Sequence, residues 1–387
     1  MTVSWRALWR EQAQALLKDT PVLLTFVAGL LLYVVLYPLP YLHQVATEQP
    51  VILLDHDQSD ASRRLVRALQ ATPGIRIDAT ATELPQALRQ VRAGERKGLV
   101  LIPADFGWDL RRGGSATVVV AADGNYFLAY GAIAESVVRA GMVLGGEVRL
   151  ARQVLLGDGQ ALLKAERGGV GLNLVPASNL KMGYLDYVLP GLFVLILHQL
   201  MLICVGISTV RQRRTPGLWQ QARLWQLLTV QASLMIPPFV LAGCWYLGPA
   251  LRGYGVTLLG SAGETALLLL PFFLATFALG TVLGHLFLHR DSLSQALVLS
   301  SMPLLFSAGF VWPVESLPLA WTALWGLVPS QPMIQGMLQL NQMGAPMAAL
   351  QPLWGILWAL VLGWGGLAAL LWQRSLRLNR PVGREAA

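Results

Sequence analysis

Residues 21–42 read PVLLTFVAGLLLYVVLYPLPYL, an apolar run without a charged side chain. A helix needs about 20 predominantly apolar residues to cross the hydrocarbon core of a bilayer, so this run is long enough to span a membrane. The polar head before it contains Arg6, Arg10 and Lys18, and it is long for the basic region of a secretory signal. No small-residue cleavage site follows the run. We therefore interpret residues 21–42 as an uncleaved first membrane span.

Five further apolar runs of similar length follow in the second half of the chain. They lie at about 187–210, 226–248, 264–288, 293–311 and 353–373. With 55% hydrophobic and only 13% charged residues, the chain is too apolar for an ordinary soluble protein of 387 residues. The predicted fold class is a polytopic α-helical membrane protein with six transmembrane helices and an inserted extracytoplasmic α/β domain.

Positive charge is distributed unevenly among the loops that join these runs. The N-terminal head, the loops after the second and fourth spans and the C-terminal tail are basic. In the opposite loops Arg252 stands alone, and residues 311–352 contain no Lys or Arg. Because basic loops stay in the cytoplasm, both termini are predicted to be cytoplasmic and the long segment after the first span extracytoplasmic. The expected location is the bacterial inner (cell) membrane, with multiple spans.

Four regions result from this topology. They are a cytoplasmic amphipathic interfacial helix over 1–20, the first transmembrane helix over 21–42, an extracytoplasmic α/β domain over 43–183, and a five-helix transmembrane domain over 184–387. The basic loops also account for the net charge of +8, so no nucleic-acid partner is expected. Cys204 and Cys244 both lie in apolar runs without metal-ligand spacing, so neither a disulfide framework nor a metal site is predicted.

Strand and helix signals alternate within residues 43–183, which indicates a small α/β domain. Strands are predicted at 51–57, 75–79, 98–103 and 116–122. Helices are predicted from Ser59 or Asp60 to Leu69, with Leu65, Val66 and Leu69 inward, over 83–96, with Leu84, Leu88 and Val91 inward, and over about 126–166. Asp55, His56 and Asp57 cluster at a strand end, where α/β proteins often bind ligands. The sequence indicates no further ligands, so we favour a turn and a helix cap there.

Motifs of known catalytic chemistry are absent from the sequence. It contains no G-x-x-x-x-G-K-[ST] loop for nucleotide phosphates, no nucleophile elbow and no zinc motif. We therefore predict that the chain is not an enzyme, has no catalytic residue and binds no metal or cofactor. If it is a pump, ATP hydrolysis must take place on a separate subunit.

Residues 312–345 are as apolar as a span, but they are interrupted by Pro318, Pro329 and Pro332. Proline breaks helices, so no continuous run of span length remains. Irregular backbone at membrane depth is tolerated when it packs on protein or lines a cavity. We predict a re-entrant segment of short helices near 312–345 that enters the outer leaflet. An ordinary hydrophobic loop is the alternative.

At this point the chain resembles the permeases of ABC-2 type transporters, in the branch with a large extracytoplasmic domain between the first two spans. The resemblance is carried by SAGFVWPVESLP (307–318), VPSQPMIQGM (328–337), VILLDHDQSDASRRLVRALQ (51–70) and YVLPGLFVLIL (187–197). It implies the membrane-spanning subunit of an ATP-binding-cassette exporter, powered by a cytoplasmic ABC ATPase subunit that binds Mg-ATP. A second permease copy or a paralogue, a periplasmic adaptor protein and membrane lipids are the other expected partners.

The resemblance also implies which residues contact the ATPase. The loop after the second span fills this role in the family, and here it reads RQRRTPGLWQQARLWQ (211–226), without the family's usual acidic residue. The predicted coupling residues are Arg211, Arg214, Leu218, Trp219 and Arg223. A basic loop held by lipid headgroups is the alternative interpretation.

Two further groups of residues are predicted to take part in transport. Trp5, Trp9 and Gln12 recur at helical spacing in an N-terminal segment that is predicted to lie in the membrane plane and to be pushed by the ATPase. The residues of the re-entrant motif are Gly309, Pro313, Glu315, Pro318 and Pro329.

The apolar, aromatic-rich spans with few fixed charges favour a hydrophobic or amphipathic small molecule or lipid as the substrate.

Proton-coupled transport is an alternative energy source, and its candidate residues are His198, Glu264 and His285. A non-transporting scaffold or sensor with a ligand-binding extracytoplasmic domain is an alternative function, and it predicts that no ATPase binds.

Overall fold

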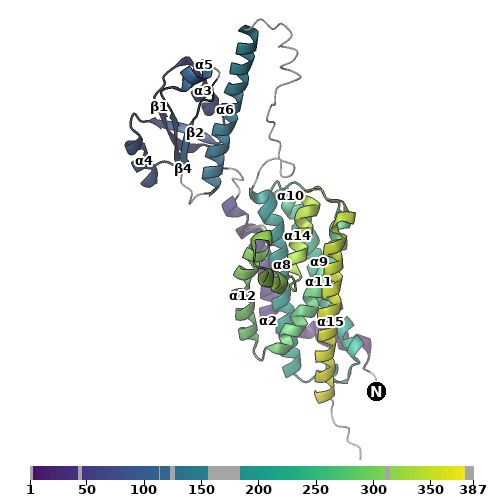
Figure 1. Ribbon diagram of the computed structural model, residues 1–387. Helices are drawn as coiled ribbons and strands as arrows, with labels where there is room; N and C mark the ends of the chain where they lie inside the picture. The colour runs from purple at the N-terminus through teal and green to yellow at the C-terminus, as the bar shows by residue number, and fades with distance from the viewer. Residues whose placement is uncertain are drawn as a thin grey trace, which may run out of the picture. The chain divides into compact units, whose positions relative to one another are not determined.

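The computed structural model describes residues 3–41, 46–112, 114–122, 127–155, 184–309 and 314–379 (Figure 1). The chain forms two compact units, one built from Met1–Leu42 with Pro176–Ala387 and the other from His43–Val175. We call the first the helical unit and the second the sheet unit.

The helical unit contains long helices joined by short turns. Its elements are α1 (Trp5–Leu17), α2 (Thr20–Leu36), η1 (Leu39–Tyr41), α8 (Tyr184–Arg214), η2 (Leu218–Gln221), α9 (Leu224–Trp245), the π-helical turn η3 (Tyr246–Ala250), α10 (Leu251–Gly253), α11 (Ala262–Leu286), α12 (Arg290–Ser307), η4 (Val314–Ser316), α13 (Leu319–Trp325), α14 (Ser330–Asn341), η5 (Met347–Leu350) and α15 (Gln351–Asn379).

Helix α8 lies at the centre of the helical unit. It packs against α2, α11, α12 and α14, and it contributes fully buried side chains such as Phe193, Leu197 and Met201. In contrast, α15 leaves apolar side chains such as Leu362 and Leu370 exposed along its length. Exposed leucine on a long apolar helix is the pattern expected of a helix that faces lipid.

The long apolar helices are those of a multi-pass membrane protein. In the described part, five helical stretches are long and apolar enough to cross a bilayer, or six if the bent pair of α1 and α2 counts as one span. Helix α12, predicted as a span at 293–311, is not among the five, because it is only 18 residues long and begins with Arg290 and Asp291. The prediction of exactly six spans is therefore not established by length and composition.

Helix α6 (Phe127–Leu155) belongs to those five although it lies in the sheet unit. It packs on the sheet, as Figure 1 shows, and buries Ile133, Val137, Ala140 and Leu144 in the core of that unit. Its apolar composition is therefore explained by core packing. The predicted helix over 126–166 runs past Leu155 into residues that lie outside the described part of the chain.

The sheet unit is built on four strands in the order β2-β1-β3-β4. These strands are β1 (Gln49–Asp55), β2 (Ile75–Thr80), β3 (Gly98–Ile102) and β4 (Val119–Ala122), of which β4 alone pairs antiparallel. Alternate residues of β1 face opposite sides, as strand geometry requires. Val51 and Leu53 join the core under α3 (Asp60–Gln70) and α6, whereas Ile52 and Leu54 pack with α4 (Leu84–Arg92).

The structure confirms the predicted strands and helices of this unit and shifts some of their bounds. The last strand is shorter than predicted and begins at Val119. The second helix ends at Arg92, and Leu84 at its first turn is exposed rather than inward, while Ala87 takes the buried position. A short helix, α5 (Phe106–Arg112), was not predicted.

The acidic cluster at the end of β1 is a turn and a helix cap, as predicted. Asp55 accepts hydrogen bonds from the backbone N–H groups of Asp57 and Gln58 and from the Ser62 hydroxyl. The Ser59 hydroxyl accepts from the Ser62 N–H and caps α3. Within the described residues no group of three or more His, Cys, Asp or Glu side chains could hold a metal ion.

Candidate functional site

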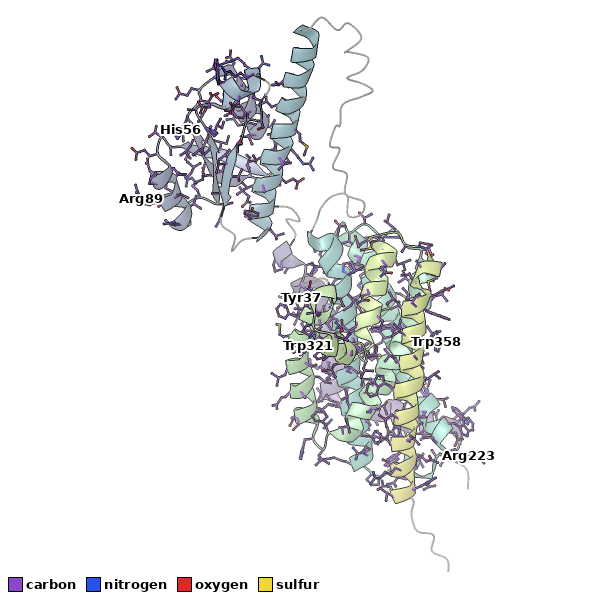
Figure 2. The ribbon with its side chains drawn as sticks, in the orientation of Figure 1. Tyr37, His56, Arg89, Arg223, Trp321 and Trp358 are labelled. Carbon is purple, nitrogen blue, oxygen red and sulfur yellow. The ribbon has the colours of Figure 1, made fainter. Side chains whose placement is uncertain are left out.

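Three parts of the chain that are distant in sequence meet at one end of the helical unit. They are the bend between α1 and α2, the corner formed by the end of α8, η2 and the start of α9, and the start of α12. We call this meeting point the α1 junction. Figure 2 labels Arg223 at the same end as the chain's N-terminus, which Figure 1 marks.

A buried carboxylate holds the α1 junction together. Asp19 is the residue before the first turn of α2, and its side chain is only 1% exposed. Its Oδ2 atom lies 3.0 Å from Nη1 of Arg211, at the end of α8, and 3.1 Å from Nη1 of Arg290, at the start of α12. Arg211 also donates to the Ala15 carbonyl at the end of α1. A buried charge is tolerated when it is paired, and here two cations from two other helices pair it.

A second carboxylate joins α1 to the corner. Glu11 accepts the backbone N–H of Leu218, with Oε1 at 3.0 Å and Oε2 at 3.1 Å. Gly217 leaves room for this approach, because a Cβ atom there would displace the Glu11 carboxylate. The corner is therefore held by an acidic side chain of α1 rather than by one of its own.

An aromatic core fills the space behind this contact. It is formed by Leu8, Trp219, Ala222, Leu227, Val230, Trp372 and Leu376. Trp219 and Trp372 meet edge to face with 5.6 Å between ring centroids, and the Trp219 indole N–H donates to the Thr215 carbonyl. Trp219 is 2% exposed, and its packing on Trp372 fixes the corner to α15. Its predicted role in coupling stays a prediction, which it would fulfil through this packing.

The other predicted coupling residues divide into paired and exposed ones. Arg211 is engaged inside the junction, and Leu218 is half-buried beside Glu11. Arg214 and Arg223 are exposed. These two arginines remain the side chains of the predicted set that a partner can reach directly.

Helix α1 has one buried face and one exposed aromatic face. Leu8 is buried in the aromatic core, whereas Trp5 and Trp9 are 42% and 46% exposed. The Trp5 ring lies 5.1 Å from that of Trp225 at the start of α9. The amphipathic helix predicted at the N-terminus is therefore present, and its tryptophans form an accessible surface beside the corner.

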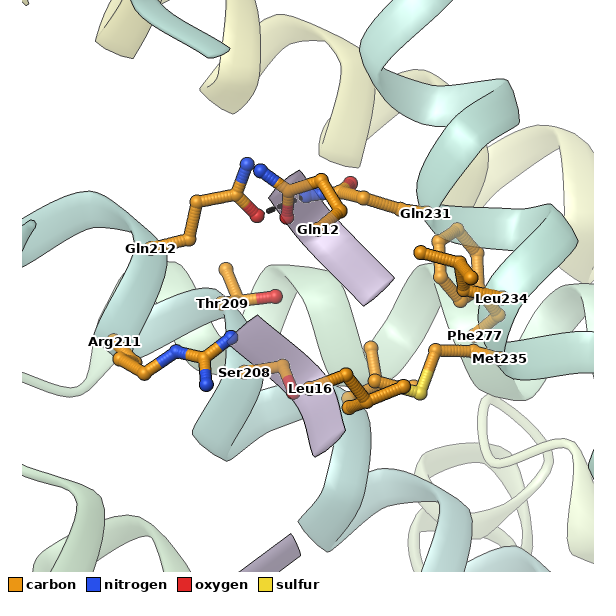
Figure 3. Close-up of a pocket in the computed structure, with 11 residues that line it drawn as sticks. Gln12, Leu16, Ser208, Thr209, Arg211, Gln212, Gln231, Leu234, Met235 and Phe277 are labelled. Atoms are coloured by element: carbon orange, nitrogen blue, oxygen red, sulfur yellow. Dashed lines mark hydrogen bonds between the residues drawn. The ribbon is translucent and has the colours of Figure 1, made fainter. Parts of the chain in front are cut away.

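A small cavity lined by both polar and apolar side chains lies directly beneath α1 (Figure 3). Gln12 of α1 points into it together with Ser208 and Gln212 of α8 and Gln231 of α9. Gln231 donates to Gln212, and the cavity volume of about 30 Å³ is sufficient for a water molecule, which needs about 10–15 Å³. Gln12, predicted as an interfacial residue, thus faces the interior and lines a seam between α1, α8 and α9 that has room for a water molecule.

The re-entrant motif forms two short helices, α13 and α14, as the prolines predict. Pro318 and Pro329 stand immediately before them, and Gly309 has a φ of +86°, which favours glycine. Helix α14 is largely buried against α8 and α11. Pro313 and the side chain of Glu315 lie outside the described residues. The depth of this segment in a membrane stays a prediction.

The residues considered for proton coupling are not arranged as a chain. His198 is buried in the helix core, and His285 contacts the Thr281 carbonyl and the Trp372 ring. Glu264 is half-buried and forms a capping box with Ser261 at the start of α11. No hydrogen bond joins any two of these three residues within the described structure.

Sequence reasoning missed three residues of the α1 junction, namely Glu11, Asp19 and Arg290. One sequence signal could have found the two acidic residues, because acidic residues are scarce in the N-terminal head and in the basic loops. Glu11 and Asp19 are the only acidic residues before the first apolar run, and in the folded chain Asp19 pairs with two arginines while Glu11 accepts the Leu218 N–H. A lone acidic residue at a strongly basic end is a candidate for pairing.

Comparison with known families gives one finding that covers most of the chain. A family model described as ABC-2 family transporter protein matches residues 21–370. Comparison with curated proteins gives no match.

Proposed function

The chain belongs to the ABC-2 family of transporters, and from this premise we propose that it is the permease subunit of an ATP-driven exporter. Permeases of this family work in general with a cytoplasmic ABC ATPase. The proposed cargo is a hydrophobic or amphipathic small molecule or lipid, moved out of the cytoplasm or the inner leaflet. In this proposal the chain itself catalyses no reaction and binds no cofactor, and Mg-ATP is bound by the partner.

The α1 junction is the observation that carries this proposal. An exporter must convert movement of an ATPase into movement of membrane helices. At the junction, one carboxylate joins the bend between α1 and α2 to the ends of α8 and α12, and Glu11 joins α1 to the corner. A force on α1 or on the corner therefore reaches three helices through charged contacts, and the central helix α8 is one of them.

The distribution of charge supports the proposed orientation. Arg211, Arg214, Arg223 and Arg290 all belong to the α1 junction or its corner, and Arg213 donates to the Gly284 and His285 carbonyls at the end of α11. Basic residues stay on the cytoplasmic side, which supports a cytoplasmic location for this end and for both termini in this proposal. We propose that the protein lies in the inner membrane of a bacterium. The sheet unit is then on the extracytoplasmic side, where a periplasmic adaptor can bind it.

Transport by this family architecture further requires a pair of permeases. We extend the proposal to a second copy of this chain or a paralogue, surrounded by membrane lipids. The lipid-facing pattern of α15 and the exposed leucines of α2 leave apolar helix surface for both lipid and a second permease.

Affinity purification of the tagged chain in mild detergent tests the proposal. We expect a P-loop ATPase to co-purify and to give vanadate-sensitive ATP hydrolysis. Arg223→Glu reverses an exposed charge at the corner and is expected to reduce ATPase recovery severalfold. Arg252→Glu, the same change on an exposed arginine outside the α1 junction, is the matched control and is expected to have no effect. A preparation that contains only the tagged chain and hydrolyses no ATP would contradict the exporter proposal.

Asp19→Asn separates binding from coupling in the same assay. Asp19 is buried, so the ATPase surface is expected to be unchanged and recovery of the ATPase to stay at the wild-type level. Efflux of a hydrophobic dye from whole cells is expected to fall, because the arginines of α8 and α12 lose their shared partner. Full efflux in this variant would show that the junction does not transmit the movement.

A further inference from the structure

We propose that an open pocket at the bend between α1 and α2 binds the phosphate group of an anionic phospholipid. The pocket has a volume of about 400 Å³, which lies within the usual range of about 300–1,000 Å³ for ligand sites. Its wall includes Lys18, Asp19, Thr20, Arg211, Thr215 and Arg290. The inference requires the helical unit to lie in a membrane, and it does not depend on the exporter proposal.

Positive charge dominates the wall of this pocket. Three cations, Lys18, Arg211 and Arg290, stand against one carboxylate, Asp19, and the other lining residues are neutral. Lys18 is exposed and joins no ion pair within the described residues. The wall therefore has an excess of two positive charges and favours an anion. Basic pockets among membrane helices are sites at which anionic lipid headgroups bind.

The two arginines can bind a second anion without releasing Asp19. Nη1 of Arg211 and Nη1 of Arg290 lie 3.0 and 3.1 Å from Oδ2 of Asp19. A guanidinium group carries five N–H donors, so each side chain has donors beyond those of Nη1. The side chains of Arg290 and Arg211 are 41% and 19% exposed, so a ligand in the pocket can reach both of them.

The start of α2 adds backbone donors to the same wall. Thr20 is the first residue of this helix and is exposed, and Asp19 before it makes no side-chain capping hydrogen bond to the first turn. The N–H groups of a first turn have no partner within their own helix, and the helix dipole is positive at this end. The 17-residue helix α2 therefore favours an anion at the place where the three cations already gather.

The bend sets the depth of the pocket in the membrane. The directions of α1 and α2 differ by 68°. Helix α1 is amphipathic and exposes Trp5 and Trp9, as a helix in the membrane interface does, whereas α2 is apolar and contains no charged residue. A bend that joins an interfacial helix to a membrane span lies at the level of the lipid headgroups, where phospholipid phosphates are found.

An exposed apolar stripe favours a phospholipid over inorganic phosphate as the source of the phosphate group. Leu24, Val27 and Leu31 of α2 are each at least half exposed. They follow Thr20 by four, seven and eleven residues, so they share its face of the helix. The acyl chains of a lipid whose phosphate is in the pocket can lie along this stripe. Inorganic phosphate would make no contact with it.

A lipid in this pocket would contact the same parts of the chain as Asp19. Lys18 follows α1, Arg211 belongs to the end of α8, and Arg290 begins α12. One phosphate group bound by these three cations would join the three segments of the α1 junction a second time. The lipid composition of the membrane therefore acts on the junction directly.

Native mass spectrometry of the full chain in mild detergent tests the proposal. The first bound lipid is quantified during titration with phosphatidylglycerol or phosphatidylcholine of identical acyl chains. Both lipids contain a phosphate group, but only phosphatidylglycerol has a net negative charge. We expect phosphatidylglycerol to bind at least about fivefold more tightly, the ratio that one basic residue supplies. Equal binding of the two lipids would overturn the proposal.

Lys18→Gln removes one cation of the pocket and leaves the pairs of Asp19 intact. The variant is expected to bind phosphatidylglycerol about fivefold more weakly and phosphatidylcholine as before. Arg10→Gln is the matched control, because Arg10 is an exposed cation of α1 that does not line the pocket. Its lipid binding is expected to stay at the wild-type level. Unchanged binding in Lys18→Gln, or an equal loss in Arg10→Gln, would contradict the assignment of the site.

Thr215→Glu provides a second variant that keeps all three cations. Thr215 is exposed in the wall, and a carboxylate there is expected to weaken phosphatidylglycerol binding by at least about fivefold. Undiminished binding would place the lipid outside the pocket.

Competition with inorganic phosphate distinguishes the two sources of the anion. A large molar excess of inorganic phosphate is compared with sodium chloride at equal ionic strength. We expect phosphatidylglycerol to remain bound equally in both, because inorganic phosphate lacks the contacts with the apolar stripe of α2. Displacement by phosphate alone would assign the pocket to a free anion and overturn the lipid source.

None of these measurements requires the ATPase. Lipid binding that follows the prediction without ATPase recovery would reject the exporter proposal alone. ATPase recovery with equal binding of the two lipids would reject the lipid site alone.

Discussion

Asp55 in the sheet unit and Asp19 in the helical unit are both acidic residues at the boundary of an element, but they are stabilised in different ways. Asp55 accepts from two backbone N–H groups and from one hydroxyl, and all of these partners lie within seven residues of it. Asp19 pairs with Arg211 and Arg290, which are 192 and 271 residues away. The first arrangement can form as soon as the local turn does. The second exists only after α2, α8 and α12 have packed together.

This difference has a consequence for function. Local hydrogen bonds at the end of β1 fix a turn and the start of α3. They join residues that are close in sequence, so they do not depend on the position of another helix. Charge pairs between helices depend on the relative position of those helices. Any movement of α2, α8 or α12 changes the distances at Asp19, so this residue can transmit a conformational change, whereas Asp55 can only stabilise its own turn.

The largest effect is expected when Asp19 is replaced by alanine. Arg211 and Arg290 would then lose their shared carboxylate, and Arg211 is mostly buried. Removing one member of a buried ion pair typically costs about 3–5 kcal/mol, and the partial exposure of Arg290 favours the lower end. Thermal unfolding of the purified protein in lipid nanodiscs, followed by circular dichroism, measures the loss.

Asp291→Ala is the matched control for this prediction. Asp291 lies beside Arg290 at the start of α12, but its side chain is exposed. Exposed substitutions of this kind usually change stability by about 0.5 kcal/mol or less. An equal loss in the two variants would mean that general charge balance, and not the buried pairing, stabilises the junction.

A smaller effect is expected for Asp55→Ala. The backbone N–H groups of Asp57 and Gln58 can turn to solvent, while the Ser62 hydroxyl loses Asp55 and keeps the Ser59 carbonyl as its acceptor. Losing these hydrogen bonds to one carboxylate, with no group left unpaired, costs about 1–3 kcal/mol. Hydrogen exchange of the amides of β1 and α3 in the full chain measures it, with the exposed Asp105→Ala as the control. Unchanged exchange in Asp55→Ala would show that Asp55 does not hold the turn.

Much of the fold could be predicted from the sequence because membrane spans and buried strands are apolar runs of different length. The long runs predicted α2, α8, α9, α11 and α15, and the short apolar run at 51–57 predicted the buried strand β1. Length and composition alone do not decide two helices. Helix α12, predicted as a span, begins with two charged residues, and α6, predicted within the α/β domain, is apolar enough for a span but packs on the sheet.

The site was less predictable because its contacts join distant segments. Local spacing correctly gave an amphipathic α1 with exposed Trp5 and Trp9. The same spacing could not show that Trp219 is covered by Trp372, which lies 153 residues further along the chain. Nor could it show that the corner, which has no acidic residue of its own, receives one from Glu11. The departure from the family pattern in residues 211–226 is therefore accompanied by a carboxylate from another helix.

Glu11→Gln is expected to have a modest effect at the α1 junction. Glutamine keeps one acceptor oxygen for the Leu218 N–H but loses the negative charge. The difference between a charged and a neutral acceptor is about 0.5–1 kcal/mol. Hydrogen exchange at Leu218 should quicken about two- to fivefold, while exchange in α15 stays unchanged. Glu264→Gln, at the start of α11, provides the matched control. Slower exchange at Leu218 would rule out Glu11 as its acceptor.

The smallest effect concerns Asp60, which is fully exposed at the first turn of α3. The hydrogen bond from Arg63 and the positive charges of Arg63, Arg64 and Arg67 lower the pKa of Asp60 below its ordinary value of 3.8. A carboxyl whose pKa is lower in the folded state stabilises the fold above its unfolded pKa, and this contribution is lost as the pH falls through the folded pKa. The stability of α3 should therefore decline below about pH 4 more steeply in the wild type than in Asp60→Asn. Hydrogen exchange of α3 amides between pH 5 and pH 2.5, corrected for intrinsic rates, compares the two. Parallel curves would show that the ion pair with Arg63 makes no contribution, as is common for exposed pairs.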